Sequence, residues 1–298
     1  MISRIASSYV VALLFIAFVI VGKTVSAGET IPVKRVPAEW EPQEAIWLQW
    51  PGRWEKSYES SFARLSNVIV QYETLHILYD SPSVLADARS SIKRENGDPD
   101  HPNIHWHWIR NNSAWMRDNG PIYVIDDNKM RVQNWAFNAW GGAFGADIPF
   151  RLDNQVPSKV AKTIGLPVDV IDIVHERGNL EFNGVDTVIL NWSVIGDSRR
   201  NQGYSKARAI TDLKKHFGVS KVVFIEGVPE GDLTNGHIDG IARFINPTTV
   251  VVVDCTGESQ CAAPNNLTHA IFDAAAKTIE AAGFTVIRET IQGTRDYH

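Results

Sequence analysis

The stretch HIDGIARFINPTTVVVVD, residues 237–254, predicts two short strands, HIDGIARF (237–244) and TTVVVVD (248–254). Both segments are rich in apolar and β-branched residues, as strands with a buried face are. A helical pattern follows over 266–283, and a further strand over 284–290. The region therefore indicates a strand pair, a helix and a returning strand.

The same order recurs upstream, which predicts an α/β fold with a loose internal repeat in one domain. The earlier expected elements are strands at 45–50, 75–80, 103–109, 121–126, 130–137, 180–184, 186–192 and 219–227 and helices at 60–75, 84–96 and 205–218. The glycine-rich segment 141–147 is expected to be a flexible loop and not a linker between domains.

The composition is that of a globular protein. The chain has 298 residues, 44% of them hydrophobic, with ten tryptophans and twelve phenylalanines. Such a chain can fill a sizeable core, which excludes a disordered protein. The net charge of −5 disfavours nucleic acid as a partner, because phosphate backbones select basic surfaces, and it suits a cationic ligand weakly.

The N-terminus predicts a secretory signal peptide over residues 1–27. Arg4 precedes a long uncharged stretch that ends at Lys23, and Val-Ser-Ala closes the segment at Ala27. An uncleaved membrane anchor is the alternative. Cleavage would change the net charge from −5 to −7 and leave residues 28–298 as a secreted or periplasmic domain without a membrane segment.

The two cysteines, Cys255 and Cys261, are six residues apart across a glycine-containing loop. In an exported protein this spacing is compatible with a small disulfide, and it fits no zinc pattern. The sequence leaves open whether they pair.

His237 and Asp239 are the first candidate site residues. If they lie on a strand, as residues i and i+2 they project from the same side, about 7 Å apart. The pair could also be a core histidine with its orienting carboxylate, or half of a metal site.

Four motifs mix charged or polar residues with tryptophan or glycine at expected strand edges. They are WEPQEAIWLQWP (40–51), SAWMRDNGPIYV (113–124), FNAWGGAFG (137–145) and NGHIDGIARF (235–244). In this order they resemble the agmatine deiminase and Porphyromonas-type peptidylarginine deiminase family, over roughly residue 37 to the last residue. The resemblance implies a pseudo-fivefold αβ propeller, of which about four modules would be present and the C-terminal one missing.

The resemblance also implies roles for individual residues. Asp118 and Asp239 would bind the substrate guanidinium, and Trp115 would stack on it. His237 would act as general acid and then as general base. Glu176, in HERGNLEFNG (175–184), matches a segment that normally reads Glu-Gly-Gly, and it would orient His237 or the substrate.

Two positions depart from the family pattern. Arg177 replaces the first glycine after Glu176, where a longer side chain could reshape the pocket wall. The family's nucleophilic cysteine lies near the C-terminus, and neither Cys255 nor Cys261 has matching surroundings.

The expected activity is therefore deimination of a guanidine substrate through a cysteine-linked intermediate, without metal or organic cofactor. Agmatine would give N-carbamoylputrescine and ammonia, and peptidyl or free arginine would give citrulline and ammonia. A homo-oligomer is compatible with this activity. One alternative is a non-catalytic guanidine-binding pseudoenzyme or fragment. Another is a metal-dependent hydrolase that uses His237, Asp239 and a further histidine, for example from HWHW (105–108).

Overall fold

The computed structural model describes residues 34–145, 147–255 and 267–290. The expected signal peptide and Cys261 lie outside these residues. Among the residues described, no helix has both the length and the apolar character needed to cross a membrane.

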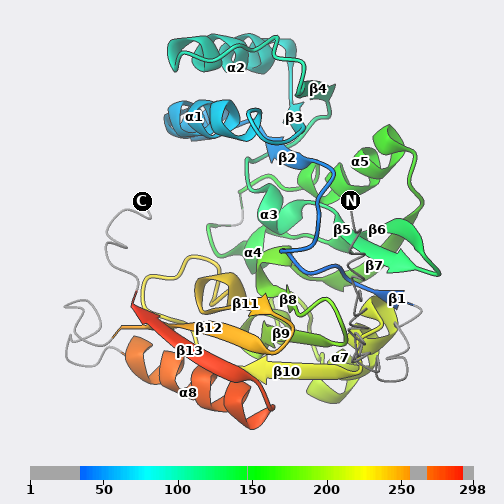
Figure 1. Ribbon diagram of the computed structural model, residues 1–298, viewed down its shortest axis with the longest axis vertical. Coiled ribbons are helices and arrows are strands. Elements are labelled where there is room, and N and C mark those ends of the chain that lie inside the picture. The colour runs from blue at the N-terminus through cyan, green and yellow to red at the C-terminus, as the bar shows by residue number, and fades with distance from the viewer. Residues whose placement is uncertain (1–33, 146, 256–266, 291–298) are drawn as a thin grey trace, which may run out of the picture. The chain divides into compact units, whose positions relative to one another are not determined.

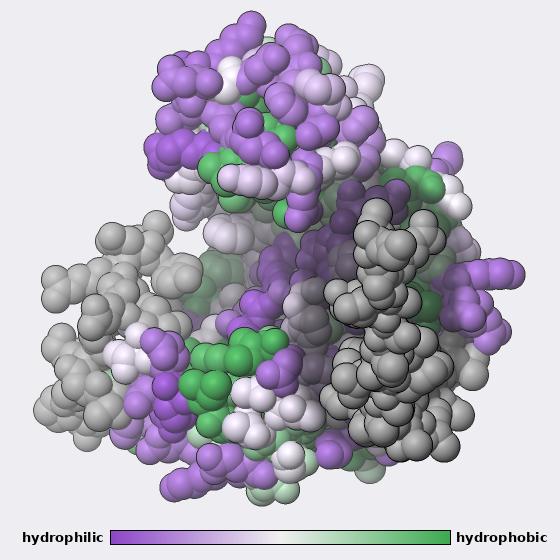
Figure 2. Space-filling view, in the orientation of Figure 1, coloured by the Kyte–Doolittle hydropathy of each residue, from purple (hydrophilic) through white to green (hydrophobic). Residues whose placement is uncertain are grey.

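The first sheet consists of three parallel strands, β2, β3 and β4, at Ile46–Gln49, Leu75–Tyr79 and Ile104–Trp108. The helices α1 (Glu59–Ile69) and α2 (Pro82–Arg94) connect these strands and pack against each other (Figure 1). The buried cluster of this sheet includes Leu75, Ile77 and Ile92. Hydrophilic side chains predominate over α1 and α2 in Figure 2.

Three further sheets repeat one connectivity. In each, a central strand pairs antiparallel with the strand before it and parallel with the strand that follows a helix. The first of them contains β5 (Ile122–Asp126), β6 (Lys129–Ala136), α5 (Val156–Ile164) and β7 (Val168–Val174), with β1 (Lys34–Arg35) at its edge. The second contains β8 (Glu181–Phe182), β9 (Thr187–Asn191), α7 (Lys206–Phe217) and β10 (Lys221–Ile225). The third contains β11 (Ala242–Asn246), β12 (Thr249–Asp254), α8 (Thr268–Ala281) and β13 (Thr285–Thr290).

The third of these sheets illustrates why the sequence folds in this way. Val250 and Val252 alternate along β12 and are fully buried. Phe272, Ala276 and Ile279 recur at helical spacing on α8 and belong to the same core cluster. In Figure 1, α8 runs along the sheet that carries β12 and β13. The prediction of an α/β protein with a repeated strand pair, helix and strand is confirmed, whereas the propeller arrangement stays a prediction.

One local prediction is wrong. His237 and Asp239 do not lie on a strand, because a short 3-10 helix, η4 (Ile238–Gly240), follows His237 and β11 begins only at Ala242. The preceding residues Asn235 and Gly236 have φ angles of +70° and +90°, which strand residues do not adopt. The two side chains therefore reach a common site from a turn and not from one face of a strand.

Candidate active site

His237 lies between two carboxylates. Its side chain is buried, with Nδ1 3.3 Å from Asp118 Oδ1 and Nε2 3.6 Å from Glu176 Oε2. The second distance is that of an ion pair and exceeds a hydrogen bond. Burial alone would lower the pKa of His237, but the charges of Asp118 and Glu176 outweigh this effect and raise the pKa to about 10. His237 is therefore an imidazolium at neutral pH.

Glu176 is held by a second cation, Arg200, and both side chains are fully buried. Arg200 Nε donates to the two oxygens of Glu176 at 2.9 and 3.0 Å, and Nη2 donates to the carbonyl of Thr234 at 3.0 Å. Burial alone would raise the pKa of Glu176, whereas His237 and Arg200 lower it to about 2. Glu176 is thus an ionised, buried residue.

Gly178 marks the point where the polar atoms converge. A β-carbon placed there would lie 2.4 Å from His237 Nδ1, 2.6 Å from Asp118 Oδ1 and 3.1 Å from Asp239 Oδ2. The first two distances are shorter than van der Waals contacts, so a side chain at this position would displace His237 and Asp118. Three short elements meet here, α3 (Met116–Asn119), η3 (Arg177–Asn179) and η4. We call these three atoms around Gly178 the cradle.

Asp239 joins the cradle to a network of arginines. Arg117 Nε donates to Asp239 Oδ2 at 3.0 Å, and its Nη1 donates to Glu39 Oε1 at 2.6 Å. Arg177 Nη1 donates to the same oxygen at 3.0 Å, and Arg243 pairs with the other oxygen of Glu39. Burial would raise the pKa of Glu39, but the three guanidinium groups lower it to about 2. The side chain of Arg177 therefore belongs to this network.

The predicted aromatic residue, Trp115, lies at the N-terminus of α3 and is 40% exposed. Its ring packs edge-on against Tyr58, with 5.8 Å between the ring centroids. The tryptophan that contacts Asp118 is Trp140, whose Nε1 donates to Asp118 Oδ2 at 2.9 Å. Stacking of a substrate on Trp115 stays a prediction.

A sequence model of the Porphyromonas-type peptidyl-arginine deiminase family matches residues 35–288. The chain belongs to this family. An agmatine deiminase of Pseudomonas syringae pv. syringae is 32% identical over 229 residues, which cover 73% of this chain and 59% of that protein. An agmatine deiminase of Pseudomonas putida is 29% identical over 283 residues, 91% of this chain and 74% of the relative. The chain thus spans about 59% of the length of the first of these relatives.

Solved structures of deiminases have the same fold. The structure of Enterococcus faecalis agmatine deiminase matches with a TM-score of 0.75 and 26% identity, covering 88% of this chain and 72% of that one. A substrate-bound agmatine deiminase of C. jejuni matches with a TM-score of 0.74 and 24% identity, covering 87% of this chain and 74% of that chain. The second match, at lower identity, bears on the fold alone.

The residues that the family resemblance selected come together in this chain. Asp118, Asp239 and His237 form the cradle, and Glu176 adjoins it. Their roles in binding and proton transfer stay predictions. Two residues were missed by the sequence reasoning, Arg200 and Trp140. The motif around Trp140 had been singled out without a role, and no local pattern points to Arg200.

The cysteine nearest in sequence to the site is not a free thiol. Cys255 is disulfide-bonded and lies buried in the core cluster beneath α8. Cys261, the chain's other cysteine, lies outside the described residues. The structure places a disulfide at Cys255, so this residue does not supply a thiolate.

The metal-dependent alternative would need a further histidine beside His237 and Asp239. The described residues contain no group of three or more histidine, cysteine, aspartate or glutamate side chains placed to hold a metal ion. The histidines of HWHW lie on β4, where His107 Nε2 is 2.7 Å from His76 Nδ1 and the rings of His76 and His105 stack. His107 is thus paired with His76 of the neighbouring strand β3.

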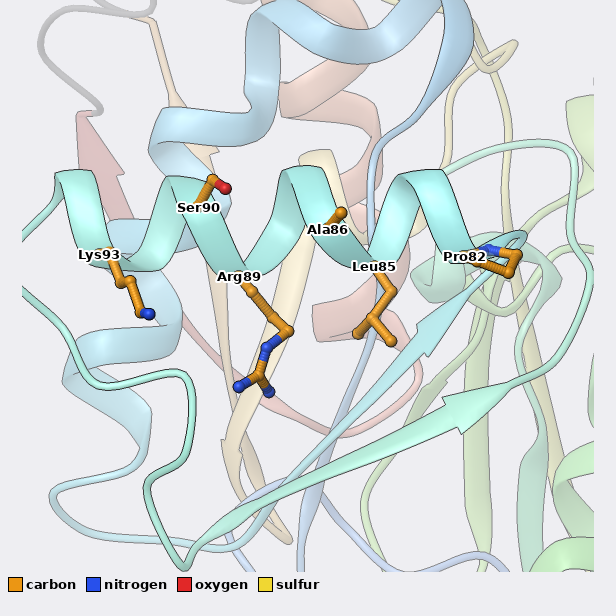
Figure 3. Close-up of a pocket in the computed structure, with 6 residues that line it drawn as sticks. All are labelled: Pro82, Leu85, Ala86, Arg89, Ser90 and Lys93. Carbon is orange, nitrogen blue, oxygen red and sulfur yellow. The ribbon is translucent and has the colours of Figure 1, made fainter.

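A shallow surface hollow lies outside the site, along α2 (Figure 3). It is lined by Pro82, Leu85, Ala86, Arg89, Ser90 and Lys93. All six residues come from one helix, whereas ligand sites gather polar groups from several elements. Arg89 is already paired with Asp100. The hollow therefore lies apart from the candidate active site.

Proposed function

We propose that the described residues form the guanidine-binding and proton-transfer part of a deiminase site. The substrate would be agmatine or an arginine, free or peptidyl. In the overall reaction the oxygen of water replaces one terminal guanidine nitrogen, which gives a ureido group and ammonia. The cradle at Gly178 is the observation that carries this proposal.

The cradle suits a guanidinium because oxygens of two carboxylates converge near His237. A guanidinium is a planar cation with a fixed fork of N–H donors, so it is recognised by carboxylates placed around its edge. The position of Asp118 Oδ1 and Asp239 Oδ2 beside Gly178 supports such a role, and the side chain of Asp118 is only 9% exposed. A cation bound there would exchange its hydration for two charged acceptors.

His237 is the proton donor in this proposal. Its imidazolium would protonate the departing ammonia, and the neutral ring would then take a proton from the attacking water. A bound guanidinium places a positive charge beside the imidazolium, and like charges lower a pKa. Substrate binding would therefore bring the His237 pKa down from about 10 toward the range in which it can release its proton.

The covalent step in our proposal uses a cysteine thiolate that attacks the guanidine carbon. Cys255 does not meet this requirement, because it is disulfide-bonded. The described residues thus account for binding and proton transfer and leave the nucleophile unassigned.

The remaining expectations belong to the same proposal. Residues 1–27 would direct export to the periplasm or the medium, since an uncharged stretch between Arg4 and Lys23 ends in a small-residue cleavage site. The repeated sheets would be arranged as propeller modules around the guanidine site. Extracellular processing at Ala27, read by N-terminal sequencing of the secreted protein, tests the first of these.

Isothermal titration calorimetry with agmatine tests the binding proposal, with putrescine as the control ligand that lacks a guanidine. Wild-type protein should bind agmatine and bind putrescine much more weakly. The Asp118→Asn variant should lose about 3–5 kcal/mol of binding free energy, roughly a hundred- to several-thousand-fold in Kd, because a guanidinium would be buried without its charged partner.

Asp126→Asn is the matched control for this substitution. Asp126 forms a partly exposed ion pair with Lys34 on the edge of the β1–β5 pair, so the variant should bind agmatine as the wild type does. An agmatine Kd that is equal in the Asp118→Asn and wild-type proteins would refute the site assignment.

A further inference from the structure

Trp140 contacts the carboxylate that faces His237. Its indole Nε1 donates to Asp118 Oδ2 at 2.9 Å, while Asp118 Oδ1 lies 3.3 Å from His237 Nδ1. The indole ring is buried and packs edge-on against Phe137 and Phe144, with 5.1 Å between ring centroids in both pairs. One oxygen of Asp118 is thus engaged by Trp140, and the other is left for the cradle.

The turn that carries Trp140 has an unusual backbone. Four successive residues, Ala139 to Gly142, have φ angles of +58°, +57°, +68° and +74°. Residues other than glycine adopt this region rarely, so the surroundings must enforce it at Ala139 and Trp140. Asn138 helps to do so, because its Oδ1 accepts from the Gly141 amide at 2.8 Å and its Nδ2 donates to the Arg199 carbonyl at 3.0 Å.

The same turn also contacts Arg200, the arginine that pairs with Glu176. A β-carbon at Gly141 would lie 3.4 Å from Arg200 Nη1 and 3.4 Å from Arg200 Cγ, so the turn packs directly on this arginine. Arg200 in turn pairs with both oxygens of Glu176. The turn at 138–142 therefore carries Trp140, the partner of Asp118, and packs against Arg200, the partner of Glu176.

We propose that Trp140 is a positioning residue: its indole N–H fixes the plane of the Asp118 carboxylate so that Oδ1 faces His237 and the guanidine cradle. The terminal torsion of an aspartate is broad, so a carboxylate without such a partner can rotate. A hydrogen bond to an ionised acceptor is strong enough to select one orientation. The effect of Trp140 on substrate binding rests on the proposed function, whereas the hydrogen bond between Trp140 and Asp118 is present without substrate.

The test is the Trp140→Phe variant, which keeps an aromatic ring and removes the N–H donor. The readout is the pKa of His237, measured by NMR titration of ring-labelled histidine and assigned by the signal that His237→Gln removes. A displaced Asp118 raises the His237 pKa less, so we expect a fall of about 1 pH unit relative to wild type. A loss of packing that only admitted water would weaken the desolvation that lowers this pKa, so it would not by itself produce a fall.

Trp106→Phe is the control. Trp106 Nε1 donates to the Pro99 carbonyl at 3.1 Å, so this variant also loses one indole hydrogen bond, but on β4 of the first sheet. It should leave the His237 pKa unchanged. An unchanged His237 pKa in a folded Trp140→Phe protein would overturn the inference.

A second variant keeps the inference testable if Trp140→Phe does not fold. Asn138→Ala removes the side chain that holds the turn and leaves the indole in place. It should lower the His237 pKa in the same direction, and an unchanged pKa would again overturn the inference. Agmatine titration of the same proteins separates the two proposals. If the wild type does not bind agmatine, the proposed function fails. The comparison of His237 pKa values still decides the role of Trp140.

Discussion

At the scale of single residues, Gly178 has the sharpest steric requirement in the candidate site. Replacing it by alanine would place a methyl group 2.4 Å from His237 Nδ1 and 2.6 Å from Asp118 Oδ1. Overpacking of this kind costs typically about 1–3 kcal/mol, and here it would also push the side chains of His237 and Asp118 out of the cradle. We expect Gly178→Ala to lower the free energy of unfolding by this amount in urea denaturation and to abolish agmatine binding.

Gly240 provides the control for this prediction. It ends η4, close in sequence to Asp239, but a β-carbon there would meet no atom within 4 Å. Gly240→Ala should therefore keep both stability and agmatine affinity. If the two alanine variants behave alike, the steric argument at Gly178 is wrong.

His237 makes the stability of the protein depend on pH in one direction. Its pKa is raised from 6.5 to about 10 in the folded state, so between these values the folded protein holds a proton that the unfolded chain releases. The stabilisation is complete below pH 6.5 and is lost as the pH rises toward 10, at roughly 1.4 kcal/mol per pH unit. Urea unfolding at pH 7, 8 and 9 should show this slope in wild type and a flatter one in His237→Gln. If the free energy of unfolding changes with pH equally in both proteins, the expected imidazolium of His237 in the folded protein is wrong.

Residues whose role the family resemblance supplies could be predicted, and residues whose role depends on a contact in the fold could not. Asp118, His237 and Asp239 stand in motifs that resemble a known family, so each could be named. Trp140 reaches Asp118 across 22 positions, and Arg200 reaches Glu176 across 24. Arg200 also follows Arg199, which ion-pairs with Asp197 and is half exposed, so nothing local distinguishes the buried arginine from its neighbour.

At the scale of elements, the segment around His237 shows how a strand-like pattern can mislead. HIDGIARF alternates well enough to predict a strand, yet the strand begins only at Ala242. The turn before it decides the outcome, because Asp232 Oδ1 accepts from the amides of Thr234 at 2.7 Å and Gly236 at 2.9 Å. Side-chain bonds of aspartate to the following backbone favour turns over ladders.

This turn supports a prediction of its own. Asp232→Ala removes the acceptor from two backbone amides and from the Thr234 hydroxyl, which in turn accepts from the His237 amide at 3.2 Å. Loss of such a cap typically costs about 0.5–2 kcal/mol. We expect that loss in urea denaturation, together with weaker agmatine binding, because His237 would be displaced. Asp98→Ala, which removes a similar acceptor from the Asp100 amide, should lower stability without changing agmatine affinity.

At the scale of the whole molecule, the repeat was predicted where its elements are long and strongly patterned. α7 and α8 were found because apolar residues recur at helical spacing over twelve and fourteen residues. The elements α5 and β7, in contrast, were missed. α5 has nine residues and ends at Gly165 with a φ of +73°, and β7 reads VDVIDIV, in which Asp169 and Asp172 break a simple alternation. Short or irregular elements of a repeat become recognisable only when the sheet that they complete is known.

The disulfide at Cys255 leads to the last prediction, which concerns the activity of the 298-residue chain. Deimination through a covalent intermediate needs a thiolate, and loss of a nucleophile costs several orders of magnitude in rate even when binding and acid–base groups remain. We expect the chain to bind agmatine but to form no N-carbamoylputrescine, with or without dithiothreitol, because opening the disulfide leaves Cys255 within the core cluster of α8 and β12. Product formation is measured for wild type and for Cys255→Ser. Turnover by wild type that disappears in Cys255→Ser would identify Cys255 as the nucleophile and contradict this expectation, whereas turnover retained in Cys255→Ser would locate the nucleophile elsewhere in the chain.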